Sequence, residues 1–217
     1  MPRRDVPNAA PLVPLNPTIE KLQTAARDCK ACDLWKSGTQ TVFGDGARNA
    51  RVLFIGEQPG DKEDLEGKPF VGPAGRVLDN ALEAAGIDRT SVYVTNAVKH
   101  FKWEPRGKRR IHKKPNAMEI AACRPWLDAE IAVVKPRAVI CLGATAAQAL
   151  LGRSFRVTES RGEIIRSNLL PYVIMATVHP SSILRTENEA TRHAEMARFI
   201  DDLKQVVPFL QATELAA

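Results

Sequence analysis

The four cysteines of this chain are spaced so that they could bind a metal. Cys29 and Cys32 form a C-x-x-C pair, and Cys123 and Cys141 are separated by seventeen residues. Thiolates are soft ligands, and four of them can hold either a [4Fe–4S] cluster or zinc. The wide second pair favours a cluster, because structural zinc sites more often use two closely spaced pairs. The alternative is that Cys123 and Cys141 are core residues, since free cysteines are commonly buried.

The segment 56–60 places an acid and an amide between glycines. It reads Gly-Glu-Gln-Pro-Gly, with Glu57 and Gln58 as its polar side chains. Glycines let a backbone approach a ligand closely, and the absence of Gly-Lys-Ser or Gly-Lys-Thr excludes a P-loop. The alternative is an ordinary tight turn. Further along, Phe70 lies among turn residues, where it either stacks on a ligand or covers the core.

A second polar cluster is the run His179-Pro180-Ser181-Ser182. The proline biases His179 toward extended backbone, and the serines offer hydroxyl and N–H groups to an anion at a predicted helix start. The run therefore either binds a ligand and a phosphate or is only a capped turn. Two further histidines, His100 and His193, are assigned to the surface.

The positive charge of the chain is concentrated in residues 99–114. The chain has 31 Lys plus Arg, 25 Asp plus Glu and a net charge of +6, and this segment alone holds eight of the cations and one acid. Cations mixed with aromatic residues favour a polyanion partner over a solvated linker. His112 lies among them, and adjacent cations disfavour its protonation. A neutral imidazole could act as a nucleophile, or His112 could be a passive contact to DNA.

Four short apolar runs are predicted as buried strands, at residues 52–55, 92–95, 138–142 and 172–176. Helical patterns follow Thr18, an N-cap candidate, and occupy residues 74–85, 117–134, 144–151 and 196–207. The alternation predicts a three-layer α/β/α sandwich around a central, mostly parallel four-stranded sheet. Ligands of such sheets bind at the carboxyl ends of the strands, where both polar clusters, Asn96 and the basic segment follow.

The composition predicts one soluble domain. Hydrophobic residues make up 44% and charged residues 26% of the chain, and no stretch approaches the ~18 consecutive apolar residues of a membrane span. Five prolines within residues 1–17 predict a flexible or loosely docked arm, and residues 18–217 are predicted as a single domain. No apolar segment follows the first residues, so we expect no secretory signal and a cytoplasmic protein.

Taken together, these motifs resemble the uracil-DNA glycosylase superfamily. The resemblance covers residues 56–60, 67–75, 94–99 and 179–182 together with the four cysteines. It is strongest to the iron–sulfur group related to family 4. Two departures resemble the UdgX branch, whose members become covalently joined to uracil-containing DNA. One is Gln58, where family 4 usually has Ala, and the other is the long basic loop that ends in Lys-Arg-Arg-Ile-His at His112.

The resemblance implies a role for each motif residue. Phe70 stacks on a flipped uracil, Asn96 reads its polar edge, and His179 stabilises the charge that develops on the leaving base. His112 then attacks the sugar carbon C1′ in place of water. Glu57 stabilises the sugar cation and either positions or deprotonates the attacking ring. The following residues complete the implied set: Gln58 and Asp61 as loop-ordering substrate contacts, Lys99, Arg109, Arg110, Ser181, Ser182 and Arg185 as DNA contacts, and Cys29, Cys32, Cys123 and Cys141 as ligands of a [4Fe–4S] cluster.

Three alternatives remain open at the level of the sequence. The protein could be a conventional multiple-turnover glycosylase in which His112 only contacts DNA. It could be a non-enzymatic iron–sulfur protein that binds nucleic acid. A zinc-bearing fold is the weakest of the three. In the favoured interpretation the partner is uracil-containing DNA, single-stranded DNA being preferred, with no membrane and no second subunit, in the bacterial cytosol or nucleoid.

Overall fold

The fold is described from a computed structural model, which covers residues 7–211. Its centre is a six-stranded sheet in the order β1-β3-β2-β6-β8-β7. The strands are β1 Asp45–Gly46, β2 Val52–Gly56, β3 Tyr93–Asn96, β6 Ala138–Leu142, β7 Ile164–Ile165 and β8 Val173–Thr177. The four longer strands pair in parallel, and the two-residue strands add antiparallel edges. The predicted α/β class is confirmed, and the predicted count of four strands is corrected to six.

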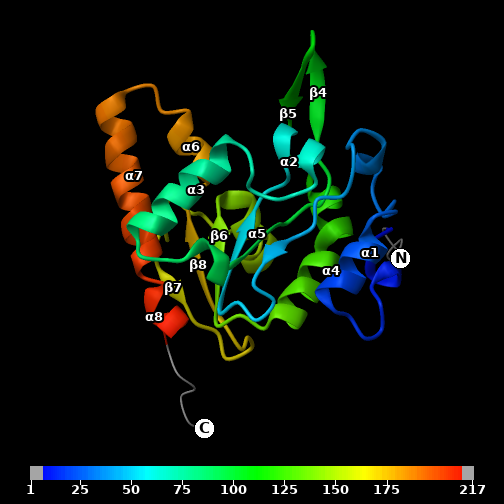
Figure 1. The fold of residues 1–217 in the computed structure, drawn as a ribbon, viewed down its shortest axis with the longest axis horizontal. Coiled ribbons are helices and arrows are strands. Elements are labelled where there is room, and N and C mark those ends of the chain that lie inside the picture. Colours follow the sequence, from blue (N-terminus) through cyan, green and yellow to red (C-terminus); the bar gives the residue numbers. More distant parts are fainter. Residues whose placement is uncertain (1–6, 212–217) are drawn as a thin grey trace.

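Two helical layers cover the sheet (Figure 1). One contains α1 Ile19–Ala26, α4 Ala117–Val134 and α5 Ala144–Leu151, and the other contains α3 Pro73–Ala84, α6 Pro180–Leu184 and α7 Glu189–Lys204. Alternate residues of β2 divide between the layers. Leu53 and Ile55 pack with α4 and α5, whereas Val52 and Phe54 pack with α3 and α7. Because side chains alternate across a strand, a continuous apolar run is suited to a sheet that is buried on both faces.

Several short elements complete the chain. They are η1 Ala10–Leu12, η2 Asp33–Lys36, α2 Asp61–Glu66, η3 Arg89–Ser91 and α8 Val207–Gln211. The helix expected over residues 196–207 ends instead at Lys204, and α8 begins three residues later, next to Pro208. Within residues 7–211, no helix is both long and apolar enough to cross a membrane.

The basic segment forms a hairpin that the sequence did not predict. Strands β4 Trp103–Arg106 and β5 Arg109–His112 pair antiparallel as a separate two-stranded sheet, with Gly107 in the turn at a φ of 59°. The hairpin projects from the body of the molecule beside α2 (Figure 1). Its residues are mostly charged and exposed, so the apolar periodicity that reveals buried strands is missing.

The described part of the predicted N-terminal arm lies against the domain. Ala9 is completely buried, and its backbone N–H donates to the carbonyl oxygen of Ala122 in α4. The side chain of Asn8 accepts from Ala10 N–H, which starts η1. Residues 1–6 of the arm lie outside the described residues. At the start of α1, Thr18 accepts from the backbone N–H of Lys21, as the predicted N-cap requires.

Candidate active site

The parallel pairing of β2, β3, β6 and β8 brings their carboxyl ends to one edge of the sheet. Glu57 follows β2, Asn96 ends β3, and His179 follows β8 after one residue. These three side chains therefore face one site although they lie up to 122 residues apart in the sequence. The rim predicted from the sequence is present.

Phe70 and Asn96 converge above Gly56, the last residue of β2. A methyl group on Gly56 would lie 2.3 Å from Oδ1 of Asn96 and 2.8 Å from the Phe70 ring, so only glycine fits there. The Phe70 and His179 rings are stacked at 30°, with 6.3 Å between their centroids. Phe70 has a φ of 57°, a left-handed conformation that is unfavourable for an aromatic residue. Such strain is found where the surrounding structure must hold a side chain in one functional position.

The hydrogen bonds around His179 fix its tautomer. Nδ1 accepts from the backbone N–H of Ser181 at 3.2 Å and lies 2.8 Å from the Ser181 hydroxyl. Because Arg185 donates to the same hydroxyl oxygen, the hydroxyl proton is free to point at Nδ1. This network assigns the ring proton to Nε2. Burial, and to a smaller extent repulsion from His112 and Arg185, lowers the pKa of His179 from 6.5 to about 4. The ring is therefore a neutral Nε2–H donor.

The serines predicted to hold phosphates are engaged inside the turn. Ser181 contacts His179 and Arg185, and the Ser182 hydroxyl donates to the backbone oxygen of His179. In the structure, residues 179–182 therefore have the geometry of a capped turn, one of the two interpretations of this run. Arg185 lies at the end of α6 with an exposed side chain.

Glu57 and His112 form a pair at the mouth of the site. One carboxylate oxygen of Glu57 lies 3.4 Å from Nε2 of His112, and the other accepts a short hydrogen bond from the Thr145 hydroxyl. The His112 side chain is 49% exposed, and its ring lies 6.1 Å from that of Phe101. Thr145 was given no role from the sequence, although its place after β6, at the same strand-end rim, was the available signal.

Gln58 attaches both strands of the hairpin to the loop after β2. Its amide nitrogen donates to the carbonyl oxygens of Lys102 and Lys113 at 3.0 and 3.1 Å, and its amide oxygen accepts from Lys102 N–H at 3.2 Å. Lys113 directly follows His112. Gln58 therefore sets the position of His112 relative to Glu57.

Arg110 forms ion pairs within the protein, and its contact with DNA stays a prediction. Its guanidinium forms ion pairs of 2.5 Å with Asp61 and 2.6 Å with Asp64, and it lies over the rings of Phe101 and Trp103. Asp64 is completely buried. The predicted role of Asp61 in ordering the loop agrees with this contact. Arg109, by contrast, is exposed at the start of β5.

Lys99 is buried, and the prediction that it contacts DNA is wrong. Its side chain is 1% exposed and forms an ion pair with the buried Glu130. The ammonium also donates to the Thr95 hydroxyl at 2.6 Å and to the backbone oxygen of Asn96 at 2.8 Å. A buried charge needs such partners, because water cannot solvate it. The sequence offered no warning, since Lys99 opens a run of exposed cations.

Three of the four cysteines lie near one another. The negative charges of Cys29 and Cys32 are among the influences that raise the pKa of Cys123, after burial as the largest cause. Trp126 donates its indole N–H to Cys29, and the backbone N–H of Lys99 donates to Cys123. Cys141 lies in the middle of the sheet in β6. Burial raises the pKa of Cys141 to about 12, and Arg124 is the charged group that acts on it.

The arrangement of the cysteines differs from that of a site for a single metal ion. Among residues 7–211, no group of three or more His, Cys, Asp or Glu side chains is arranged to hold one metal ion. A [4Fe–4S] cluster binds each ligand through a different iron atom, so its ligands are spread more widely than those of zinc.

His100 also departs from the prediction, because it is 5% exposed rather than a surface residue. Its ring packs against Gly38, in the segment that follows Cys32. Burial lowers the pKa of His100 to about 4. In the described part of the chain the ring has no hydrogen-bond partner. His193 is exposed on α7, as expected.

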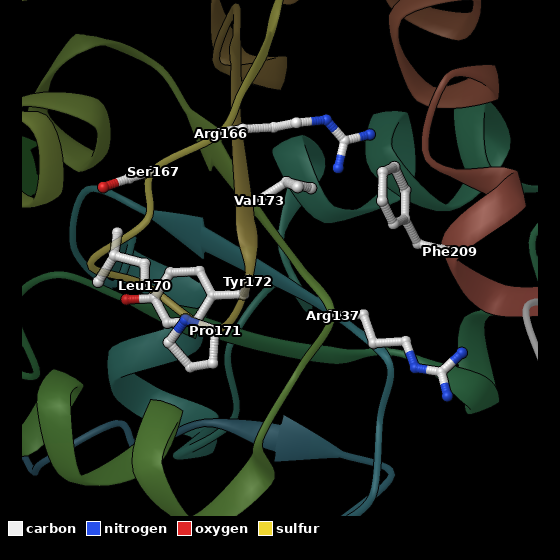
Figure 2. A pocket seen from close by; sticks show the side chains of 8 residues that line it. All are labelled: Arg137, Arg166, Ser167, Leu170, Pro171, Tyr172, Val173 and Phe209. Atoms are coloured by element: carbon white, nitrogen blue, oxygen red, sulfur yellow. The ribbon is translucent and has the colours of Figure 1, made fainter. Parts of the chain in front are cut away.

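Two depressions lie outside the rim. One is a groove between α2 and the hairpin, lined by Asp61, Leu65, Lys108, Arg109 and Arg110, with a volume of about 420 Å³. The other is at the amino-terminal ends of β6 and β8, the opposite edge of the sheet. Figure 2 shows Arg137, Arg166 and Phe209 around it, and its volume is about 300 Å³. None of the predicted site residues lines this second depression.

The sequence profile of the uracil DNA glycosylase superfamily matches residues 43–204, which include the whole rim and the hairpin. The chain belongs to the uracil DNA glycosylase superfamily. A type-4 uracil-DNA glycosylase of Thermotoga maritima is 34% identical over 194 residues, 89% of this chain and 95% of that protein. The type-4 uracil-DNA glycosylase of Saccharolobus solfataricus is 36% identical over 173 residues, 76% and 77% of the two chains. That of Sulfurisphaera tokodaii is 34% identical over 178 residues, 79% and 78%.

Proposed function

We propose that this member of the uracil DNA glycosylase superfamily removes uracil from DNA. The observation that carries the proposal is the convergence of Phe70, Asn96 and neutral His179 at one strand-end rim. A flipped base needs an aromatic surface for stacking and polar groups for its Watson–Crick edge. Phe70 and the Asn96 amide supply these. The type-4 glycosylases that cover most of the chain support the same activity.

The first step breaks the bond between uracil N1 and the sugar carbon C1′. The bonding electron pair leaves with uracil, and the sugar becomes an oxocarbenium-like cation. Nε2–H of His179 stabilises the negative charge on the base without transferring its proton, because the low pKa of His179 keeps the ring neutral. Removing one preorganised donor of this kind costs about 10²–10³ in rate. The carboxylate of Glu57, held by Thr145, stabilises the cation from the other side.

We propose that His112 then captures the sugar. As its Nε2 forms the bond to C1′, it passes its proton to the facing Glu57 carboxylate, which leaves a neutral substituted imidazole, and Glu57 then releases the proton to solvent. The departed uracil anion takes a proton from water. Support comes from the 3.4 Å separation between His112 Nε2 and Glu57, and from Gln58, which anchors the adjacent backbone. A nucleophile held at the reacting centre competes well with water because its translational entropy is already lost.

The direct test is a denaturing gel after incubation with uracil-containing single-stranded DNA. We expect a retarded protein–DNA band that saturates at one DNA per protein. His112→Ala should release uracil without forming the band, whereas Lys113→Ala, the neighbouring control, should form it. Uracil release over many turnovers without a band identifies a conventional glycosylase. An absence of release from any substrate instead favours the binding-protein alternative.

We further propose that a [4Fe–4S] cluster is held by Cys29, Cys32 and Cys123. Buried thiolates require donors, and the N–H groups of Trp126 and Lys99 supply them. The cluster would be structural, connecting the N-terminal segment to α4. The sequence favoured Cys141 as the fourth ligand; it is fully buried in β6, and Arg124, not another cysteine, is the charged group that acts on it. We propose His100 as the fourth ligand instead, because it is buried and directly follows Lys99, whose backbone N–H contacts Cys123.

His100 and Cys141 are the two candidates for the fourth ligand. Iron content, sulfide content and absorption near ~400 nm, measured on variants of each, distinguish them. We expect Cys141→Ser to retain the full iron content and His100→Ala to lose part of it. His100→Cys should restore it, because thiolate and imidazole both bind iron. The opposite pattern would restore Cys141 as the ligand, and stoichiometric zinc without iron would exclude the cluster.

A further inference from the structure

We propose that the α2–hairpin groove binds a nucleotide adjacent to the uracil, with the base against Leu65 and the phosphate between Lys108 and Arg109. The groove is the depression of about 420 Å³ described above, between α2 and strand β5. This volume lies within the range of small-ligand sites, roughly 300–1,000 Å³. The inference rests on the proposed function, because it assumes that uracil occupies the neighbouring rim.

The charge of the groove favours a phosphate. Of its three cations, Arg110 is neutralised by Asp61 and Asp64. Lys108 and Arg109 are exposed, and neither forms an ion pair within residues 7–211. Since Asp61 is itself paired with Arg110, the groove keeps a net positive charge. A strand of DNA would neutralise that charge and release its counterions.

Leu65 gives the groove an apolar surface. It lies near the end of α2 and its side chain is 58% exposed, while Asp64 beside it in sequence is completely buried. An isolated exposed leucine is common on protein surfaces and carries no meaning alone. Here it shares one depression with two unpaired cations. A nucleotide combines an apolar face with an anionic phosphate, so it complements both features. An acidic peptide would match the charge but would not require a flat apolar contact.

The position of the groove determines which nucleotide it takes. Arg109 and His112 are the two ends of β5, so their backbones are about 10 Å apart. The groove is therefore too far from the rim to hold the uracil and near enough for a neighbouring nucleotide. A base that lies on Leu65 is neither stacked on its neighbours nor paired with a complementary strand. The groove thereby gives a physical reason for a preference for single-stranded substrates.

The test removes one base at a time. In a set of uracil oligonucleotides, each neighbouring position in turn carries an abasic tetrahydrofuran. Because the base at one position would contact Leu65, we expect its removal to weaken binding of wild-type protein about tenfold. Leu65→Ala should weaken binding of the complete oligonucleotide by a similar factor and show no further loss at that position. Leu169→Ala, an exposed leucine beyond β7 at the opposite edge, is the matched control.

Equal losses in wild-type and Leu65→Ala protein at every position would overturn the inference. So would an acidic peptide that displaces the oligonucleotide only from protein with Leu65 intact. Lys108→Gln and Arg109→Gln should each lower the salt dependence of binding by about one counterion. Binding is measured on protein that carries both His112→Ala and His179→Ala, so that neither trapping nor uracil release consumes the oligonucleotide. A failure to release uracil would refute the proposed function, whereas the abasic series reports on the groove independently.

Discussion

The strand-end rim and the hairpin that carries His112 are built on different principles. The rim side chains follow strands whose backbones are paired on both sides and whose apolar residues are fully buried. The hairpin is a two-stranded sheet that is mostly exposed, and two-stranded sheets have little stability by themselves. Side chains hold it in place: Gln58 at its base and Arg110 along one face.

The two regions can support different chemical steps. Bond cleavage needs donors that do not move as charge develops, and a rim fixed by the core provides them. Capture of the sugar needs only one nucleophile within reach, which a tethered surface element can supply. Changes in the rim should therefore affect both steps, and changes in the hairpin should affect capture alone.

The largest effect is expected for His179→Ala. It removes the Nε2–H donor at the rim, so the single-turnover rate constant for uracil release should fall by about 10²–10³. Adduct formation should fall in parallel, because no sugar cation forms. His193→Ala, on the exposed face of α7, is the control and should leave both rates unchanged. Loss of the adduct with normal release would place His179 in the capture step and contradict the division between the regions.

Lys99→Met tests the buried ion pair between Lys99 and Glu130, next to Asn96 of the rim. The change leaves the Glu130 carboxylate buried with its charge uncompensated, so the free energy of unfolding should decrease by about 3–5 kcal/mol. Urea unfolding measures this decrease. The salt dependence of DNA binding should stay constant, because Lys99 does not reach solvent. Lys62→Met, an exposed lysine of α2, should leave stability within about 0.5 kcal/mol.

Arg110→Met tests the tether of the hairpin. Asp64 keeps its hydrogen bonds from the Thr39 N–H and hydroxyl but loses its opposite charge, so stability should also decrease, and the rates are compared well below the unfolding transition. Without the ion pairs, we expect adduct formation to slow about tenfold, since positioning contributes strongly to intramolecular attack. Uracil release should change by less than about threefold. Arg106→Met, exposed at the end of β4, is the control. Equal slowing of both steps would show that the hairpin also serves cleavage.

The smallest effect is the pH dependence. Because the pKa of His179 is lowered to about 4, uracil release should be independent of pH from 8 to 5 and decline as the pH approaches 4. Unfolded His179 titrates at its ordinary value of 6.5, so the unfolded chain binds a proton that the folded chain does not. The free energy of unfolding should therefore fall as the pH drops from 6.5 toward 4 and be constant above 6.5. His179→Asn should reduce this slope, and an unchanged slope would contradict the lowered pKa.

Much of the fold and of the rim could be read from the sequence. The apolar runs at β2, β3, β6 and β8 are continuous because both faces of the sheet are buried, and their chain order with intervening helices implied parallel strands. The polar clusters that follow them were therefore expected at one edge. Strands β1 and β7 have two residues each, and the hairpin is charged, so neither has an apolar period to detect.

The sequence alone determined the class of the sheet, the rim and the identity of its polar residues, because periodicity and strand-end position are properties of the local chain. Only the tertiary structure decided which individual charged side chains are buried and which are exposed. Lys99 and Arg109 look alike in the sequence, yet one is buried on Glu130 and the other faces solvent. His100 was expected at the surface and is buried for the same reason: burial depends on which distant elements pack together.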